Sequence, residues 1–477
     1  MLSSEPYRYP RLREAATTLC DSGGQRGGLF RWTFTRLDSY VKFLKILKMK
    51  RHLTLLFVVF IGINGTMIAQ EADEKIGNLI NQTDWFTLAE EYPKLKEEMQ
   101  SEMLKHLSEA MIGLYFNQPQ NAIQDIDWLL VNAQNELGFE NTSNLILIKS
   151  VILGEQGLYA ESADNLSDFF TQISKSMDLE KFPAHKQTLE FYEKMRNERR
   201  PEVIRPDKDI VIPITIEKTN RGQTIFVPVN INGKEYKFIF DTGAFSSFVS
   251  ERFANEVGLR ITDESFKISG IKSGIGKRGT TDSIMVGDIA FKNPSITIGL
   301  PNEEVDTIFQ VDAVLGMDFI RRIGESDIYP EEKKIVFPAK KTELPLYGRN
   351  ILFSNGQPYL KAYSNTETLI FHFDTGNIKT DLFNVYYKKH KEELDKVGNK
   401  SNVRRQGYGG IRFVDSYQIP KFPLTVGDCN FELTDVDVLL DNRYDFQGNE
   451  DGSLGMDFFT AFRKVIINFD EMFVKVE

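Results

Sequence analysis

The tripeptide Asp-Thr-Gly occurs twice in the 477-residue chain, at 241–243 and 374–376, and each copy ends a run of apolar and aromatic residues. Each copy is followed, in the same order, by Val-Gly-Asp and then by Leu-Gly-Met-Asp-Phe. These markers lie at 286–288 and 315–319 in the first half, and at 426–428 and 454–458 in the second. Three markers repeated in one order indicate an internal duplication, so we expect two similarly folded halves.

Hydrophobic periodicity separates this duplicated region from the part of the chain before it. From 71 to 200, apolar residues recur at every third or fourth position, with breaks at Gln118-Pro119, Gly138 and Gly157. This pattern predicts a helical domain at 71–200 made of helix hairpins. The array is loosely similar to tetratricopeptide repeats, and an unrelated helical bundle is the alternative.

After a charged linker around 197–207, the hydrophobic period changes to two. Isoleucine recurs at every second position, at Ile210, Ile212, Ile214 and Ile216, which is typical of β-strands. Asn232-Gly233 is a hairpin-turn signal between two such strands. This half of the chain is therefore predicted to be all-β.

The segment from about Pro206 to Glu477 resembles the aspartic protease superfamily. Its short lobes, with Asp-Thr-Gly-Ala in the first, are most similar to retropepsin-like bacterial aspartyl proteases. The resemblance implies two mostly β lobes, at 206–345 and 346–477, within one monomeric two-lobed protease. The predicted fold class is thus multidomain: an α-helical hairpin array followed by an all-β, two-lobed aspartic-protease fold.

Asp241 and Asp374 are the candidate catalytic residues. Two carboxylates held close together cannot both ionise easily, so the pair keeps one proton and titrates as a unit. In the superfamily, one carboxylate activates a water molecule while the protonated one polarises the peptide carbonyl. The resemblance therefore implies an aspartic-type endopeptidase, and the alternative is a catalytically inactive protease-fold protein that binds peptides.

The resemblance also assigns supporting roles around this pair. Thr242 and Thr375 are expected to exchange hydrogen bonds between the lobes. Gly243 and Gly376 are expected to let backbone N–H groups reach the carboxylate oxygens. Small hydroxyl residues, Ser247 and Thr380, follow at equivalent positions, where ordinary polar strand residues are the alternative reading.

The second copy departs from the family pattern at two positions. Asn377 stands where the family has Ala, Ser or Thr, and this substitution favours the inactive alternative. His372 precedes Asp374 by two residues and is expected to face the same side of a strand. We interpret His372 as a structural residue rather than a catalytic one.

Net charge and histidine spacing indicate which ligands and partners the chain binds. No cofactor and no metal are expected, because the five histidines show no metal-ligand spacing. The formal charge of −10 argues against nucleic-acid binding. The expected partners are a protein or peptide substrate and a protein bound by the helical domain.

Residues 49–69 have the basic start and apolar centre of a signal peptide, so we expect an exported protein, periplasmic or extracellular. The apolar run is too short to span a membrane, although an uncleaved anchor behind a cytoplasmic tail is an alternative. Residues 1–48 are expected to be an upstream extension from a mis-assigned translation start. Of two cysteines, Cys429 is interpreted as a structural thiol.

Overall fold

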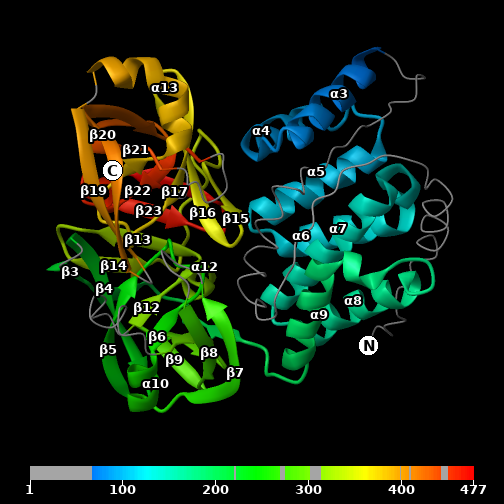
Figure 1. The fold of residues 1–477 in the computed structure, drawn as a ribbon, viewed down its shortest axis with the longest axis horizontal. Helices are drawn as coiled ribbons and strands as arrows, with labels where there is room; N and C mark the ends of the chain where they lie inside the picture. Colours follow the sequence, from blue (N-terminus) through cyan, green and yellow to red (C-terminus); the bar gives the residue numbers. More distant parts are fainter. Residues whose placement is uncertain are drawn as a thin grey trace. The chain divides into compact units, whose positions relative to one another are not determined.

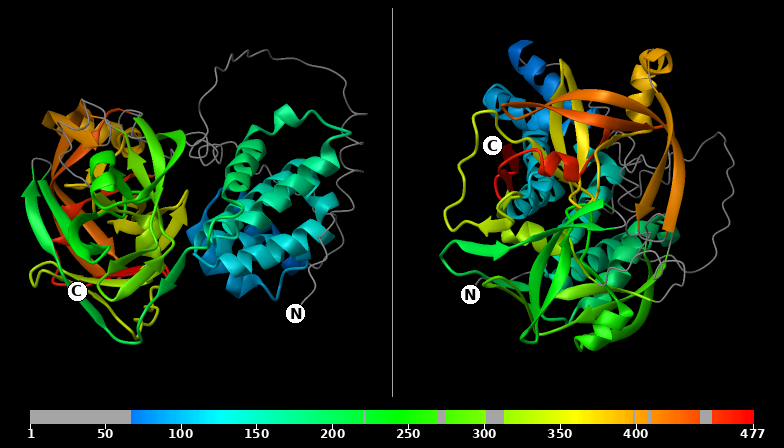
Figure 2. Two further views of the ribbon diagram at one scale, coloured as in Figure 1. Left: turned by 90° about the horizontal axis from the view of Figure 1, so that it is seen from below. Right: turned by 90° about the vertical axis from the view of Figure 1, so that its left-hand side faces the viewer.

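The computed structural model describes residues 67–219, 222–268, 274–300, 313–397, 399–407, 410–441 and 450–477. The chain divides into two compact units, one ending at Arg200 and the other running from Pro201 to Glu477. Helices make up the first unit and strands dominate the second, as Figures 1 and 2 show. The predicted fold class, a helical array followed by an all-β two-lobed unit, is confirmed.

The expected extension at 1–48 lies outside the described residues, and so does most of the expected signal peptide at 49–69. Only its last three residues are described, at the start of a helix that begins at Met67. Both assignments stay predictions. Within the described ranges, no helix is long and apolar enough to cross a membrane.

The helices of the first unit begin and end where the sequence offers capping residues. Ser101 accepts a hydrogen bond from the Leu104 N–H at the start of α5, and prolines occupy the first positions of α6 and α9. Gly138 has φ of +72° and interrupts α7 at a predicted break. The elements are α3 (Met67–Asn81), α4 (Trp85–Leu95), α5 (Glu102–Tyr115), α6 (Pro119–Asn132), α7 (Gln134–Glu155), α8 (Tyr159–Ile173), the 3₁₀ helix η2 (Leu179–Lys181) and α9 (Pro183–Met195).

Consecutive helices of this unit pack against each other through apolar faces. The side of each helix that faces the unit's interior carries buried residues such as Leu107, Leu129, Leu166 and Tyr192. Gly154 of α7 allows a close approach, because an added Cβ would lie 1.9 Å from the Tyr192 ring. The helical array is thus present, while its likeness to tetratricopeptide repeats stays a prediction.

The first lobe of the second unit is a strongly curved sheet. Its strands pair in the order β1-β10-β9-β4-β5-β12-β6-β11-β8-β7, with β3 beside β4. Two short helices, α10 (Glu251–Glu256) and α12 (Met317–Ile323), follow β6 and β12. The strands are β1 (Glu202–Ile204), β3 (Thr215–Thr219), β4 (Gly222–Ile231), β5 (Lys234–Phe240), β6 (Phe248–Ser250), β7 (Arg260–Ile268), β8 (Gly274–Thr280), β9 (Ser283–Val286), β10 (Ile289–Lys292), β11 (Ser295–Gly299) and β12 (Ala313–Leu315).

The second lobe repeats the topology of the first. Its order β16-β17-β22-β18-β21-β20-β19 matches β4-β5-β12-β6-β11-β8-β7 strand for strand, so the duplication seen in the sequence is also present in the fold. The strands are β15 (Ile351–Ser354), β16 (Gln357–Ser364), β17 (Glu367–Phe373), β18 (Asp381–Leu382), β19 (Asn399–Gly407), β20 (Gly410–Val426), β21 (Cys429–Leu439) and β22 (Gly452–Leu454), with helices α13 (Asn384–Val397) and α14 (Met456–Phe459).

A separate five-stranded sheet joins the two lobes. Strand β13 pairs with β23 in antiparallel register, from Glu325 opposite Asn468 to Ile328 opposite Val465. Backbone hydrogen bonds across this pairing link the lobes independently of the candidate site. The sheet runs in the order β2 (Ile210–Pro213), β14 (Lys334–Phe337), β13 (Glu325–Tyr329), β23 (Val465–Asn468) and β24 (Phe473–Val476).

Glycine-containing turns set the register of the hairpins. The predicted Asn232-Gly233 turn joins β4 to β5, with both residues at positive φ. The two Val-Gly-Asp markers are also hairpin turns, joining β9 to β10 and β20 to β21. Their glycines, Gly287 and Gly427, have φ of +55° and +61°, a conformation that a residue with a side chain rarely adopts.

Candidate active site

Both Asp-Thr-Gly loops leave the end of a buried strand and are held by the strand beside it. Asp241 follows β5, and its N–H donates to the Leu315 carbonyl at 3.0 Å. Asp374 follows β17, and its N–H donates to the Leu454 carbonyl at 3.1 Å. The Leu-Gly segments of the duplicated motif therefore support the two loops in the same way.

Each carboxylate is oriented by N–H groups of its own loop. Asp241 Oδ1 accepts from the N–H of Gly243 at 2.9 Å and of Ala244 at 3.1 Å. Asp374 Oδ1 accepts from the N–H of Gly376 at 2.8 Å and of Asn377 at 3.1 Å. Two backbone donors on one oxygen fix the side-chain rotamer, so both carboxylates project from the loops in equivalent directions.

The two carboxylates meet between the lobes. A Cβ added to Gly243 would lie 2.2 Å from Cγ of Asp374, and one added to Gly376 would lie 2.5 Å from Cγ of Asp241. Each carboxylate thus lies directly against the glycine of the opposite lobe. The glycines serve the donor role expected of them, and they also leave the space that the opposite carboxylate occupies.

The two threonines cross-link the lobes beneath the carboxylates. The Thr242 hydroxyl donates to the Phe373 carbonyl at 2.7 Å, and the Thr375 hydroxyl donates to the Phe240 carbonyl at 2.6 Å. Each hydroxyl also accepts from the N–H of the other threonine, at 3.0 and 2.9 Å. Neither threonine is exposed. The interlobe exchange expected for these residues is therefore present with both halves in one chain.

A second pair of carboxylates supports the loops from behind, and sequence reasoning gave these residues no role. Asp318 Oδ1 accepts from the N–H and hydroxyl of Ser247, at 2.8 and 2.7 Å. Asp457 Oδ1 accepts equivalently from Thr380, at 2.8 and 2.7 Å. The hydroxyls in turn accept from the N–H of Gly316 and of Gly455. The signal was the Asp repeated in both Leu-Gly-Met-Asp-Phe motifs.

The surroundings of the carboxylate pair favour retention of a proton. Burial raises the pKa of Asp241, and the negative charge of Asp374 raises it further. Burial also raises the pKa of Asp374, although the N–H of Gly376 and the charge of Arg405 oppose this shift. The Asp374 side chain keeps 21% of its surface exposed, so water can reach the pair. The surroundings thus support one proton shared by the pair.

His372 lies beside the pair as a buried neutral ring. Its Nδ1 is 3.8 Å from Asp374 Oδ2, and its ring packs against Tyr359. Burial lowers the pKa of His372 to about 4, so the ring carries no charge near neutral pH. The equivalent position in the first lobe is Ile239, since both residues pair with the supporting strand in the same register. This placement agrees with the structural role assigned to His372.

The Asn377 side-chain amide donates to neither carboxylate of the candidate pair. Its amide donates to Asp381 and to Ser453, each at 3.2 Å. Its backbone N–H makes the same contact to the carboxylate that Ala244 makes in the first lobe. The departure from the family pattern therefore leaves the loop geometry unchanged.

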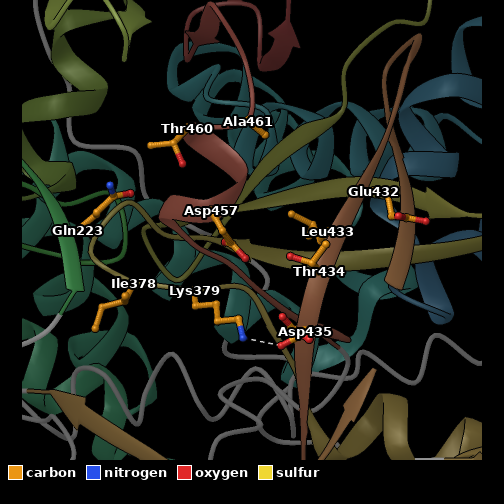
Figure 3. A pocket seen from close by; sticks show the side chains of 10 residues that line it. All are labelled: Gln223, Ile378, Lys379, Glu432, Leu433, Thr434, Asp435, Asp457, Thr460 and Ala461. Atoms are coloured by element: carbon orange, nitrogen blue, oxygen red, sulfur yellow. Dashed lines mark hydrogen bonds between the residues drawn. The ribbon is translucent and has the colours of Figure 1, made fainter. Parts of the chain in front are cut away.

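A surface pocket of about 440 Å³ lies beside the second Asp-Thr-Gly loop. Figure 3 shows Ile378 and Lys379, which continue that loop, opposite Glu432 and Asp435 of β21, with Asp457 between them. The catalytic candidates do not line this pocket, so it borders the carboxylate pair's supporting residues rather than the reacting atoms.

One group of potential metal ligands occurs among the described residues, in the helical unit. His106, Glu109 and Asp125 each place a ligand atom within 4.8 Å of the others. The Lys96 ammonium and the Tyr92 hydroxyl already bond to Glu109, and His106 bonds to Asp125. An ammonium group thus occupies the neighbourhood that a metal ion would need. The expectation that the protein uses no metal stays a prediction.

Part of the first lobe is similar to a known protein family. Residues 227–322, which include the first Asp-Thr-Gly and Leu-Gly-Met-Asp-Phe motifs, match the family model of the gag-polyprotein putative aspartyl protease. Among solved structures, the aspartic proteinase from Irpex lacteus aligns over 56% of this chain and 96% of its own, at 13% identity and a TM-score of 0.35. No curated protein matches the sequence.

The family match confirms the resemblance to retropepsin-like aspartyl proteases that the motifs predicted. It covers the first lobe, and the second lobe carries the same motifs on the same strand order. Together, the match and the duplicated site support a peptidase-like function that acts on peptide substrates.

Proposed function

We propose that this protein is an exported aspartic endopeptidase that hydrolyses peptide bonds with a water molecule activated by Asp241 and Asp374. The observation that carries the proposal is the meeting of these two carboxylates. Each comes from its own lobe, is oriented by two N–H donors, and lies against the glycine of the other lobe.

A single proton shared by Asp241 and Asp374 gives the two carboxylates complementary roles. The ionised carboxylate takes a proton from the water molecule as the water oxygen bonds to the peptide carbonyl carbon. The protonated one donates its proton to the carbonyl oxygen, which yields a neutral tetrahedral diol. The carboxyl that took the water's proton then donates it to the peptide nitrogen. As the C–N bond breaks, a diol hydroxyl returns its proton to the other carboxylate, so the pair is singly protonated again.

Other parts of the chain bind a protein partner and direct export. The substrate is a protein or peptide, and the monomeric chain needs no second copy because both lobes are present. The helical unit recruits or positions a protein partner, and the signal-like residues 49–69 direct export to the periplasm or the extracellular space. N-terminal mass spectrometry of the native protein should find a mature start near Gln70; an intact 1–48 segment would contradict export by this route.

A peptide-binding protein without turnover is the competing function, and Asn377 was the residue that favoured it. The contacts of Asn377 do not favour this function, because its N–H still donates to Asp374 while its side-chain amide donates to Asp381.

Cleavage of an unfolded protein distinguishes the two functions. The native protein is incubated with a reduced, alkylated substrate protein from acidic to neutral pH in the presence of a chelator, and new peptide ends are identified by mass spectrometry. We expect cleavage by the wild type, none by Asp241→Asn, and full cleavage by Asp288→Asn, which alters an exposed hairpin turn. If all three proteins bind the substrate protein and none of them produces new peptide ends, the binding function is supported instead.

A further inference from the structure

The second lobe contains a buried polar group of residues that the first lobe replaces with apolar ones. Strand pairing fixes the equivalence: Asp381 pairs with Ser453 in the second lobe as Phe248 pairs with Val314 in the first. The loop residue that contacts them is Asn377 in the second lobe, where the first has Ala244. Three neighbouring positions are therefore apolar in the first lobe and polar in the second.

These polar residues connect the loop of Asp374 to a hairpin strand. The guanidinium of Arg405, on β19, donates from Nη1 to Asp381 Oδ2. Asn377 donates to the same oxygen through its side-chain amide at 3.2 Å, and to Asp374 Oδ1 through its backbone N–H at 3.1 Å. We call Arg405, Asp381 and Asn377 the polar bridge. It runs unbroken from the β19–β20 hairpin to a catalytic carboxylate.

The polar bridge is costly to build and is not needed to stabilise a lobe of this topology. Asp381 is only 2% exposed, and a carboxylate at such a position must be paired to stay ionised. Other charged groups face it as well: Asp437 lies opposite Asp381 on β21, and Lys379 lies 3.8 Å from Asp437. The first lobe has the same strand order with Phe248 in place of Asp381, so this topology does not require a charge at that position.

We propose that Arg405 is a positioning residue that, through Asp381 and Asn377, fixes the β19–β20 hairpin to the loop that carries Asp374. Movement of the hairpin strand is thereby restricted in the free protein, and the loop is held with its N–H aimed at the carboxylate. The positive charge also favours the ionised form of Asp374, which makes the two similar lobes chemically unequal. The effect on cleavage rests on the proposed function, whereas the mechanical link does not.

Hydrogen–deuterium exchange of the full chain measures the mechanical link directly. In Arg405→Met, amides of β19 and the facing part of β20 should exchange at least tenfold faster than in the wild type. Their exchange rates in Arg405→Lys should lie between those of the wild type and Arg405→Met. Arg404→Met is the matched control, because it removes the same side chain from the adjacent, exposed position of the same strand. Equal exchange in Arg405→Met and Arg404→Met would overturn the proposal.

Arg405→Met leaves the Asp381 carboxylate buried without its cation, so this variant is prone to misfolding. The double variant Asp381→Asn/Arg405→Met removes both charges and keeps an acceptor for Asn377. It should fold, and its hairpin amides should still exchange at least tenfold faster than those of the wild type. If the hairpin amides of this variant exchange as slowly as those of the wild type, the polar bridge does not hold the hairpin.

Peptide cleavage then separates a positioning role from a structural one. In the folded double variant, kcat should fall about tenfold or more, and the acidic limb of the kcat profile should move to higher pH, because Asp374 loses a nearby cation. An unchanged profile with wild-type kcat would limit the polar bridge to structure and overturn the positioning role. If no variant and no wild type cleaves peptides while the exchange difference persists, the proposed function fails and the mechanical link stands.

Discussion

Replacing Thr242 with valine tests whether the two lobes depend on the crossed threonine hydrogen bonds. The Thr242 hydroxyl donates to the Phe373 carbonyl at 2.7 Å and accepts from the Thr375 N–H at 3.0 Å, in fully buried surroundings. Valine has nearly the same shape but leaves both main-chain groups without this partner. Each buried polar group left unpaired costs about 1–3 kcal/mol, so the free energy of unfolding of the β unit should fall by about 2–6 kcal/mol.

Thr242→Ser is the matched control, because it keeps the hydroxyl and removes only one methyl group, worth about 0.8 kcal/mol. The three tryptophans, Trp32, Trp85 and Trp128, all precede the β unit, so their fluorescence reports only on the helical unit. Unfolding of the β unit is therefore followed in urea by hydrogen exchange of peptides that cover the two Asp-Thr-Gly loops. A free energy of unfolding for Thr242→Val within about 0.5 kcal/mol of that for Thr242→Ser would show that the lobes do not depend on these hydrogen bonds.

Gly243→Ala should lower kcat/KM about 100-fold or more, since the new carbon would lie 2.2 Å from Cγ of Asp374 and must displace that carboxylate. Gly77→Ala, which meets nothing within 4 Å, is its control and should retain wild-type activity in the same peptide assay. His372 has its pKa lowered by burial from 6.5 to about 4, so the folded state binds fewer protons than the unfolded state between these values, and stability is lost as pH falls through this window. In urea unfolding at several pH values, the free energy of unfolding should fall less steeply with decreasing pH for His372→Ile than for the wild type. A difference in free energy of unfolding between the two proteins that stays constant with pH would contradict this. Specific activity should stay constant on dilution, because both lobes lie in one chain, and a steep fall measured over a dilution series would reveal a required dimer.

Local patterns in the sequence were sufficient to predict the order of the elements and the two Asp-Thr-Gly loops. The Asn232-Gly233 turn and the break at Gly138 are each encoded by one or two residues whose backbone preferences are strong. The duplication added long-range information, because equivalent motifs imply equivalent positions in two lobes. The resemblance to aspartic proteases then implied that the two loops meet, which neither the periodicity nor the duplication indicates alone.

Contacts between residues distant in sequence and outside a known motif were not predicted. Arg405 and Asp381 are 24 positions apart, on strands whose register only the folded sheet defines. Gly243 was expected to admit a backbone donor, whereas its closest constraint is a carboxylate from the other lobe. Such requirements arise from packing between elements, and a single sequence carries no direct record of them.

In the proposed function, Asp241 and Asp374 act as one unit that shares a proton. Its most direct test is the kcat/KM of Asp241→Asn, Asp374→Asn and the double variant on a peptide that the wild type cleaves, with folding of each checked by hydrogen exchange. We expect each single substitution to abolish nearly all hydrolysis and the double substitution to lose little more, because either change already removes the shared-proton pair. Substantial activity in Asp374→Asn, or losses that multiply in the double variant, would contradict the two-carboxylate mechanism.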